Sequence, residues 1–141
     1  MTQEEKDLLL KDLSARLPYG VKVRYSSYEK FITCTLQALK PVYNIVDLWS
    51  KEACFNSVHI NKIKPYLFPL SNMSEEQKKY VTDRWGINEN FNFEIDPNWG
   101  EYFVELGDVL GFINWCYENH FDINRLIPKG LAIDATNKNI Y

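Results

Sequence analysis

The chain has 141 residues with a formal net charge of −3, and 45% of its residues are hydrophobic and 15% aromatic. A chain of this length and composition can bury a hydrophobic core of its own, which excludes wholesale disorder and makes stabilising disulfides unnecessary. The small net charge argues against a strongly basic nucleic-acid-binding protein, although it is compatible with a local basic patch.

The charges are distributed unevenly along the chain. Residues 1–70 carry ten Lys/Arg and seven Asp/Glu, whereas residues 71–141 carry six Lys/Arg and twelve Asp/Glu. The basic excess lies within residues 20–70, which hold seven Lys/Arg and three Asp/Glu. This opposition would permit head-to-tail self-association, and it leaves the oligomeric state open.

The sequence predicts a protein of the cytoplasm. Its opening residues are charged, and no stretch approaches the ~18–20 apolar residues of a membrane span. The three cysteines, Cys34, Cys54 and Cys116, are odd in number and lack the close spacing of a disulfide framework or a zinc site. We therefore expect free thiols and no membrane contact.

A helix is predicted within residues 1–20. Thr2 and Glu5 have the spacing of a capping box, in which each side chain accepts a hydrogen bond from the backbone of the other residue. Leucines repeat every four residues along one face of this helix: Leu9, Leu13 and Leu17. The helix should end at Pro18-Tyr19-Gly20, because proline cannot donate into the helical ladder and glycine turns freely.

A run of short strands is predicted next. β-branched and aromatic residues, in part alternating with polar ones, indicate strands at 21–25, 31–36, 43–49 and 57–60. So many short strands in so few residues predict a meander that curls into a small barrel, because curling removes exposed edges. Residues 63–67 are expected to form a short helical turn that leads out of this segment.

Two further helices are predicted after the strands. Ser74-Glu-Glu-Gln77 is a second capping box, and Gly86 is suited to cap the C-terminus of the helix that it starts. Apolar residues with helical periodicity over 106–117 predict an amphipathic helix. Asp122 is placed to cap one more helical turn, and the polar tail from Asp134 is expected to fray.

The predicted fold class is therefore α+β: one helix, then a small SH3-like antiparallel β-barrel or meander, then two to three helices. We expect a single domain over residues 1–141, with a helix in 1–20, a barrel-like segment in 21–67 and a helical segment in 74–133. Residues 87–100 combine alternating aromatic residues with several Asn and Pro, so both a strand and a lid-like loop remain open for them.

Several short motifs resemble a known family. They are Ile63–Glu76, Asn119–Asp122, Leu126–Ala132 and Leu17-Pro-Tyr-Gly20, which together touch both ends and the middle of the chain. They resemble a family of small proteins from phages and mobile elements of gut anaerobic bacteria that has no established activity. The resemblance implies an accessory role in the cytoplasm of a bacterial host cell, and it supplies no functional residues.

The two histidines do not form a recognisable catalytic or metal site. His59 is titratable and could serve as a base, but in a strand-like run a half-buried structural histidine is expected. His120 lies near a helix end between Glu118 and Asp122, where histidines often interact with the helix dipole and the last carbonyl groups. Ligands two residues apart do not share one helix face, so no metal site is predicted.

Other reactive residue types also have structural explanations. Cys116 falls on the apolar helix stripe, and Cys54 is the thiol expected to be exposed. Glu101, Glu105 and Asp108 have helical spacing and predict a solvated acidic face rather than a paired-acid site. No glycine-rich nucleotide motif is present. We therefore predict no catalytic residues, no cofactor and no enzymatic activity.

The basic segment also contains many aromatic residues, a combination that small barrels use to bind peptides or nucleic acids. The predicted interaction surface consists of Lys22, Arg24, Tyr28, Tyr43, Trp49, Lys62, Lys64 and Tyr66. Ordinary surface lysines over an aromatic core would produce the same pattern.

The predicted function is that of a non-enzymatic module of a phage or mobile element that binds another protein. The first alternative is a weak nucleic-acid-binding protein that uses the basic aromatic face, and the second is an enzyme of unrecognised type. The absence of catalytic motifs, the excess of aromatic residues and the opposed charges of the two halves favour the binding module.

Overall fold

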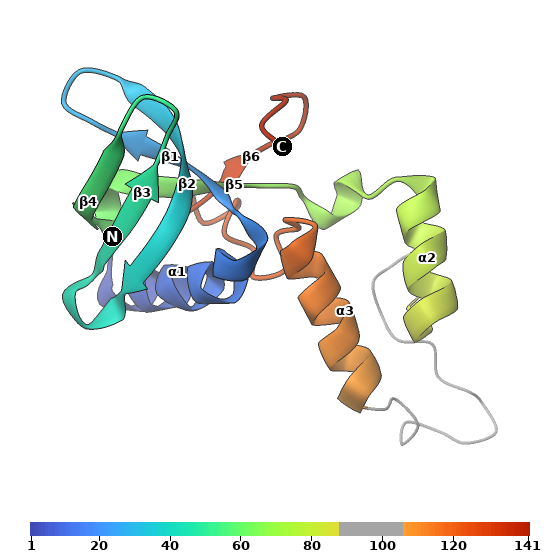
Figure 1. Cartoon of the computed structure of the whole chain (residues 1–141). Coiled ribbons are helices and arrows are strands. Elements are labelled where there is room, and N and C mark those ends of the chain that lie inside the picture. The colour runs from blue at the N-terminus through green and yellow to red at the C-terminus, as the bar shows by residue number, and fades with distance from the viewer. Residues whose placement is uncertain (88–105) are drawn as a thin grey trace.

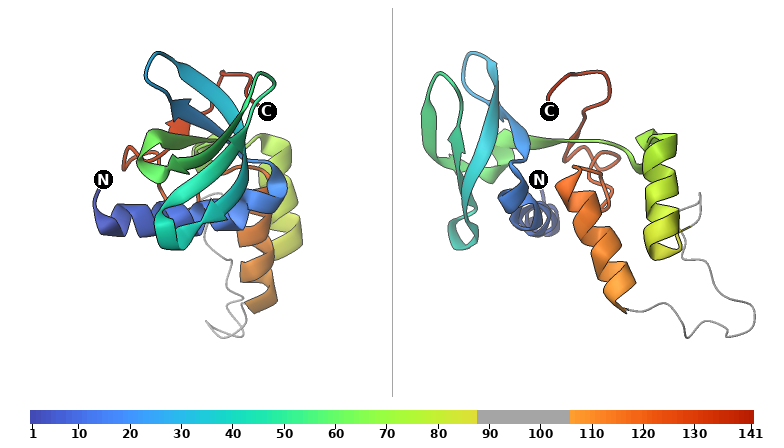
Figure 2. Two further views of the ribbon diagram at one scale, coloured as in Figure 1. Left: turned by 60° about the vertical axis from the view of Figure 1, so that its left-hand side comes forward. Right: turned by 45° about the vertical axis from the view of Figure 1, so that its right-hand side comes forward.

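The computed structural model describes residues 1–87 and 106–141, and these form an α+β architecture (Figure 1). Helix α1 (Gln3–Arg16) lies across one face of a six-stranded sheet. Helices α2 (Glu75–Trp85) and α3 (Leu106–Glu118) lie beyond the sheet, with α3 nearer to α1 (Figure 2). The α+β fold class predicted from the sequence is confirmed.

Helix α1 forms for the local reasons that the sequence predicts. Thr2 Oγ1 accepts a hydrogen bond from the Glu5 amide at 3.1 Å, and the Glu5 carboxylate accepts one from the Thr2 amide at 2.7 Å. The helix passes into a single 3₁₀ turn and ends at Gly20, whose φ of 67° is left-handed. Leu9 and Leu13 are fully buried, so the leucine face packs against the sheet.

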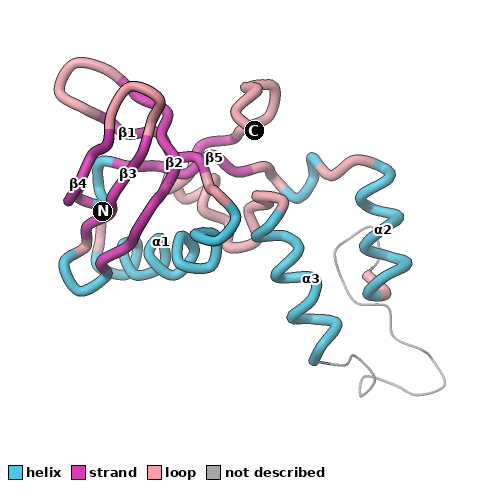
Figure 3. The backbone as a smooth tube through the Cα atoms, in the orientation of Figure 1, coloured by secondary structure: helices cyan, strands magenta, loops and turns pink. Residues whose placement is uncertain are grey.

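The sheet is mostly antiparallel (Figure 3). Its strands are β1 (Lys22–Ser26), β2 (Phe31–Lys40), β3 (Ile45–Trp49), β4 (Cys54–His59), β5 (Ile63–Leu67) and β6 (Ile133–Asp134). Their order is β4-β3-β2-β1-β5-β6, and the β5–β6 pair is parallel. The register of β2 against β3 shifts between Leu36 and Ala38, and such bulges bend a strand.

The sheet is open rather than closed into the predicted barrel. β5 pairs with β1 on one side and with β6 on the other, so within the described residues β4 is left as an edge strand. Ile63–Leu67 is therefore a strand and not the expected helical turn. The prediction for this segment is wrong because pairing with β1, a non-local interaction, outweighs the local turn signal of Pro65.

The polar tail is ordered by the sheet, contrary to the expectation that it frays. Ile133–Asp134 pairs with β5, and the Ala135 amide donates to the Leu67 carbonyl at 2.8 Å. The Tyr141 hydroxyl donates to the Tyr66 carbonyl at 2.8 Å and accepts from the Lys22 amide at 3.1 Å. Backbone pairing and the Tyr141 hydroxyl therefore order residues 133–141, which their polar composition predicts to be frayed.

Two hydrophobic cores support this arrangement. The larger joins α1 to the inner face of the sheet and includes Leu13, Val23 and Leu48. The smaller lies between α2 and α3 and is rich in aromatic side chains, with the Trp115 ring stacked on Phe121 at a centroid distance of 5.6 Å. The prediction of a single domain is not tested by this packing and stays a prediction.

The predicted ends of α2 and α3 can be compared directly with the structure. The Ser74–Gln77 capping box and the left-handed Gly86 cap are both present. After α3, the Asp122 carboxylate accepts hydrogen bonds from the amides of Leu126 and Ile127, but turns form there instead of the expected helical turn. Residues 88–100, which the sequence leaves open between strand and loop, lie outside the described residues.

Gly111 marks a close approach between α3 and α2. A Cβ atom at this position would lie 2.6 Å from Trp85 Nε1, and the Trp85 ring also packs on Phe112 and Tyr80. Overpacking costs about 1–3 kcal/mol, while alanine gains about 1 kcal/mol of helix propensity over glycine. We therefore expect Gly111→Ala to lower the free energy of unfolding by about 1 kcal/mol in urea titration.

The control for this substitution is Asn114→Ala, which lies on the exposed side of the same helix. It should leave the free energy of unfolding unchanged or raise it slightly, because it changes helix propensity alone. A Gly111→Ala protein as stable as the Asn114→Ala protein would show that Trp85 does not restrict this position.

Candidate binding surface on the outer face of the sheet

The side chains of the sheet separate by strand alternation into an inner and an outer set. On β2, the inner set packs with the core: Ile32, Cys34 and Leu36. The alternate positions on the same strand face away from the core: Phe31, Thr33 and Thr35. Helix α1 covers the inner side, so the second set lies on the opposite, solvent-facing side.

Cross-strand pairing extends this second set into two rows. One row runs Lys22, Thr35, Trp49 and Cys54 across β1, β2, β3 and β4. The other runs Lys64, Arg24 and Thr33 across β5, β1 and β2. We use the term outer face for the members of these rows on β1, β2, β3 and β5 together with Phe31: Lys22, Arg24, Phe31, Thr33, Thr35, Trp49 and Lys64.

Two large aromatic side chains of the outer face are open to solvent. Phe31 is 68% exposed and Trp49 is 44% exposed. The Arg24 guanidinium lies over the Phe31 ring, with its Cζ atom 4.3 Å from the ring centroid. In the loop after β1, Tyr28 is contacted in the same way by the Lys62 ammonium at 4.7 Å. Cation–π contacts therefore hold exposed rings beside cations.

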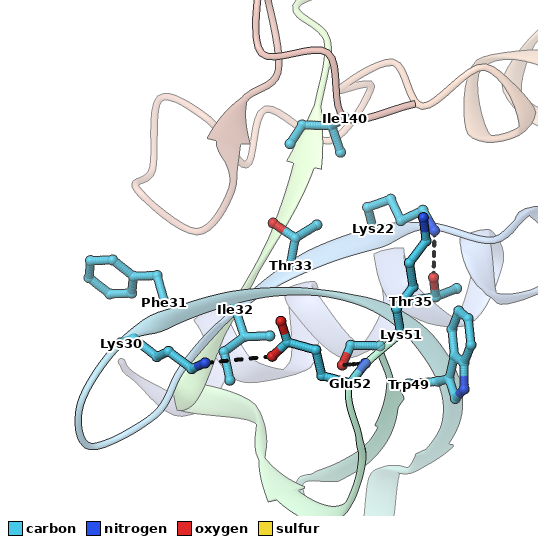
Figure 4. A pocket seen from close by; sticks show the side chains of 11 residues that line it. Lys22, Lys30, Phe31, Ile32, Thr33, Thr35, Trp49, Lys51, Glu52 and Ile140 are labelled. Carbon is cyan, nitrogen blue, oxygen red and sulfur yellow. Dashed lines mark hydrogen bonds and ion pairs between the residues drawn. The ribbon is translucent and has the colours of Figure 1, made fainter.

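A shallow groove of about 390 Å³ runs over the outer face (Figure 4). It is lined by Lys22, Lys30, Phe31, Ile32, Thr33, Thr35, Trp49, Ser50, Lys51, Glu52 and Ile140. Within the groove, the Lys22 ammonium donates to the Thr35 hydroxyl at 2.6 Å. Lys30 pairs with Glu52 at 3.5 Å, an exposed pair that contributes little.

The remaining cations of this region have no carboxylate partner within the described part of the chain. Lys22, Arg24, Lys51 and Lys64 form no ion pair among residues 1–87 and 106–141. Arg24 Nε is buried and has no hydrogen-bond partner in the same residues. The field over the outer face is therefore positive although the whole protein is acidic.

The structure brings together part of the predicted interaction surface. Lys22, Arg24, Trp49 and Lys64 lie on the outer face, and Tyr28 and Lys62 lie together at the end of β1. Two other members lie elsewhere. Tyr43 is in the turn between β2 and β3, outside the groove, and Tyr66 is only 8% exposed.

The interaction surface predicted from the sequence leaves out Lys30, Phe31 and Lys51, which line the groove. Phe31 could have been found, because it has the same alternation phase as Thr33 and Thr35, opposite to the core residues of its strand. Lys30 and Lys51 come from loops, whose path depends on the register of the strands that they connect. No local pattern places the Lys30 side chain in the same groove as Trp49.

The structure does not place the candidate catalytic residues in one site. Cys54 and His59 lie at opposite ends of β4, about 16 Å apart at the usual strand rise. His120 follows α3 beside Phe68, at the other end of the sheet order from β4. Burial raises the pKa of the Cys34 thiol, and it raises the pKa of Cys116 to about 12, so both thiols stay protonated.

Among residues 1–87 and 106–141, no group of three or more His, Cys, Asp or Glu side chains could hold a metal ion. Asp108 lies half-buried in the first turn of α3. Glu101 and Glu105 lie outside the described residues, so their predicted solvated face stays a prediction.

These features define an α+β protein with an open sheet, one face of which carries cations and solvent-exposed aromatic rings. No protein-family model, no curated protein and no solved structure matches the chain. Among the helices that the structure describes, none is both long and apolar enough to cross a membrane. The resemblance to a family of phages and mobile elements therefore stays a prediction.

Proposed function

We propose that this protein is a non-enzymatic accessory module, of a phage or mobile element, that binds a negatively charged macromolecule through the outer face. The observation that carries the proposal is the combination, on that face, of exposed rings with cations that form no ion pair among residues 1–87 and 106–141. Lys22, Arg24 and Lys64 stand in adjacent rows beside Phe31 and Trp49.

Exposed rings of this size are informative because the solvent side of an antiparallel sheet is usually polar. Neither hydrophobic core includes Phe31 or Trp49, and both rings are exposed to solvent. Aromatic residues and arginine are also the types most enriched at binding surfaces. The sequence predicts another protein as the partner, with a nucleic acid as the alternative, and the positive field of the outer face would attract either one that presents negative charge.

A polyanion column tests the charge requirement directly. The wild-type protein should be retained on heparin-agarose at low salt, although its net charge of −3 would predict repulsion. The triple variant Lys22→Glu/Arg24→Glu/Lys64→Glu should pass through, because it reverses the field over the outer face. Urea unfolding of each variant would show that the loss of retention is not a loss of fold.

The matched control reverses three cations outside the outer face: Lys79→Glu/Arg84→Glu/Lys129→Glu. These side chains are exposed, and the control has the same net charge as the outer-face variant. It should stay on the column at low salt. Equal loss in both variants, or a wild-type protein that is not retained, would contradict the proposal.

A further inference from the structure

The two exposed rings of the outer face lie at opposite ends of one groove (Figure 4). Phe31 and Thr35 are four residues apart on β2, about 13 Å along the strand, and Trp49 is the cross-strand partner of Thr35. The rings are therefore too far apart to contact one planar group together. They are spaced to contact two groups of a longer, extended ligand.

Cations lie between and beside these rings. Lys22 shares a row with Trp49, Arg24 lies over one side of the Phe31 ring, and Lys51 lines the groove. An ammonium has three donors, and Lys22 uses one of them on Thr35, so two remain for a ligand. An extended ligand in this groove would meet flat apolar surfaces and positive charges along its length.

Single-stranded nucleic acid has this chemistry. Its bases stack on aromatic rings without regard to sequence, and its phosphates are attracted to lysine and arginine. In a duplex the base faces are already stacked on one another, so they cannot reach Phe31 or Trp49. A peptide of Asp and Glu could use the cations, but its carboxylate side chains offer no ring to stack on Phe31 or Trp49.

We infer that the ligand of the outer face is single-stranded nucleic acid, with bases stacked on Phe31 and Trp49 and phosphates against Lys22, Arg24 and Lys51. This inference rests on the proposed function and names its partner. Binding should be weakly selective for sequence, because every base has a face to stack. It should also weaken with salt, because phosphate contacts release counterions.

The test is fluorescence anisotropy with a labelled oligothymidine of about 12 nucleotides, within the range that one small sheet-based domain covers. Phe31→Ala and Trp49→Ala should each weaken binding by about tenfold, since stacking on one ring contributes about that much. Tyr43→Ala is the control, because Tyr43 is 70% exposed but lies outside the groove. It should bind as the wild type does.

Competition with three unlabelled polyanions separates this inference from the proposed function. Unlabelled oligothymidine should displace the probe, whereas polyglutamate and a duplex of the same length should displace it poorly. If duplex or polyglutamate competes as well as oligothymidine, or the two ring variants bind as tightly as wild type, single-strand recognition is overturned while the charged binding face stands. A wild-type protein that binds neither oligothymidine nor heparin would overturn both.

Discussion

Replacing Asp12 with alanine is expected to lower the free energy of unfolding by about 3–5 kcal/mol. The Asp12 carboxylate pairs with the Arg16 guanidinium at 2.7 and 3.0 Å, and both side chains are 0% exposed. The substitution would leave a buried guanidinium without its counter-charge. Equilibrium unfolding in urea at neutral pH measures the loss.

The expected loss is large because the pair is part of a longer buried network. Arg16 also donates to the Phe121 carbonyl at 2.7 Å, and its guanidinium lies over the Tyr117 ring at 5.0 Å. Asn124 donates to the Asp12 carboxylate at 2.8 Å and to the Tyr117 hydroxyl at 3.2 Å. The pair therefore fastens α1 to α3 and to the segment that follows it.

Two further variants distinguish this explanation from a general effect of removing a carboxylate. Glu52→Ala removes one partner of the exposed Lys30 pair and should change stability by about 0.5 kcal/mol or less. The double variant Asp12→Leu/Arg16→Met removes both buried charges and should recover much of the loss. An Asp12→Ala protein as stable as the Glu52→Ala protein would show that the buried guanidinium is stabilised without Asp12.

The sequence predicts the ends of α1 and α2 because the signals for a helix end are local. The capping boxes at Thr2 and Ser74 and the left-handed glycines Gly20 and Gly86 lie within a few residues of the ends that they determine. Asp12 and Arg16 can also be recognised as a helical pair from their spacing. The complete burial of the two side chains cannot be recognised from this spacing. It depends on packing with distant segments, and one partner, Asn124, lies 112 residues away from Asp12.

The strands show the opposite case. β5 and β6 acquire their structure from pairing with segments far away in the chain, and Pro65 and the polar tail hide that structure locally. The outer face could be predicted from the sequence only in part. Alternation of Lys22 and Arg24 with buried valines predicts that both face solvent, whereas the alignment of Trp49 with Lys22 depends on the register of three strands.

His120 occupies a helix end that normally requires glycine. Its φ is 62°, and the amides of His120 and Phe121 bond back to the carbonyls of Tyr117 and Cys116, the pattern of a Schellman cap. The imidazole stacks on the Tyr141 ring at 3.8 Å, and its Nδ1 atom is buried without a hydrogen-bond partner among the described residues. Burial, followed by the nearby charges of Arg16 and Lys22, lowers the pKa of His120 from 6.5 to about 4.

This depressed pKa predicts that the protein loses stability as the pH falls. Unfolded His120 has a pKa near 6.5, so between pH 6.5 and about 4 the unfolded chain binds a proton that the folded protein does not. From about pH 7 to about pH 5 the loss should be about 2 kcal/mol in urea titration. His120→Asn tolerates the left-handed backbone but does not titrate, so its free energy of unfolding should fall by less over the same range. Parallel pH curves for the two proteins would show that His120 is protonated as readily in the folded state as in the unfolded chain.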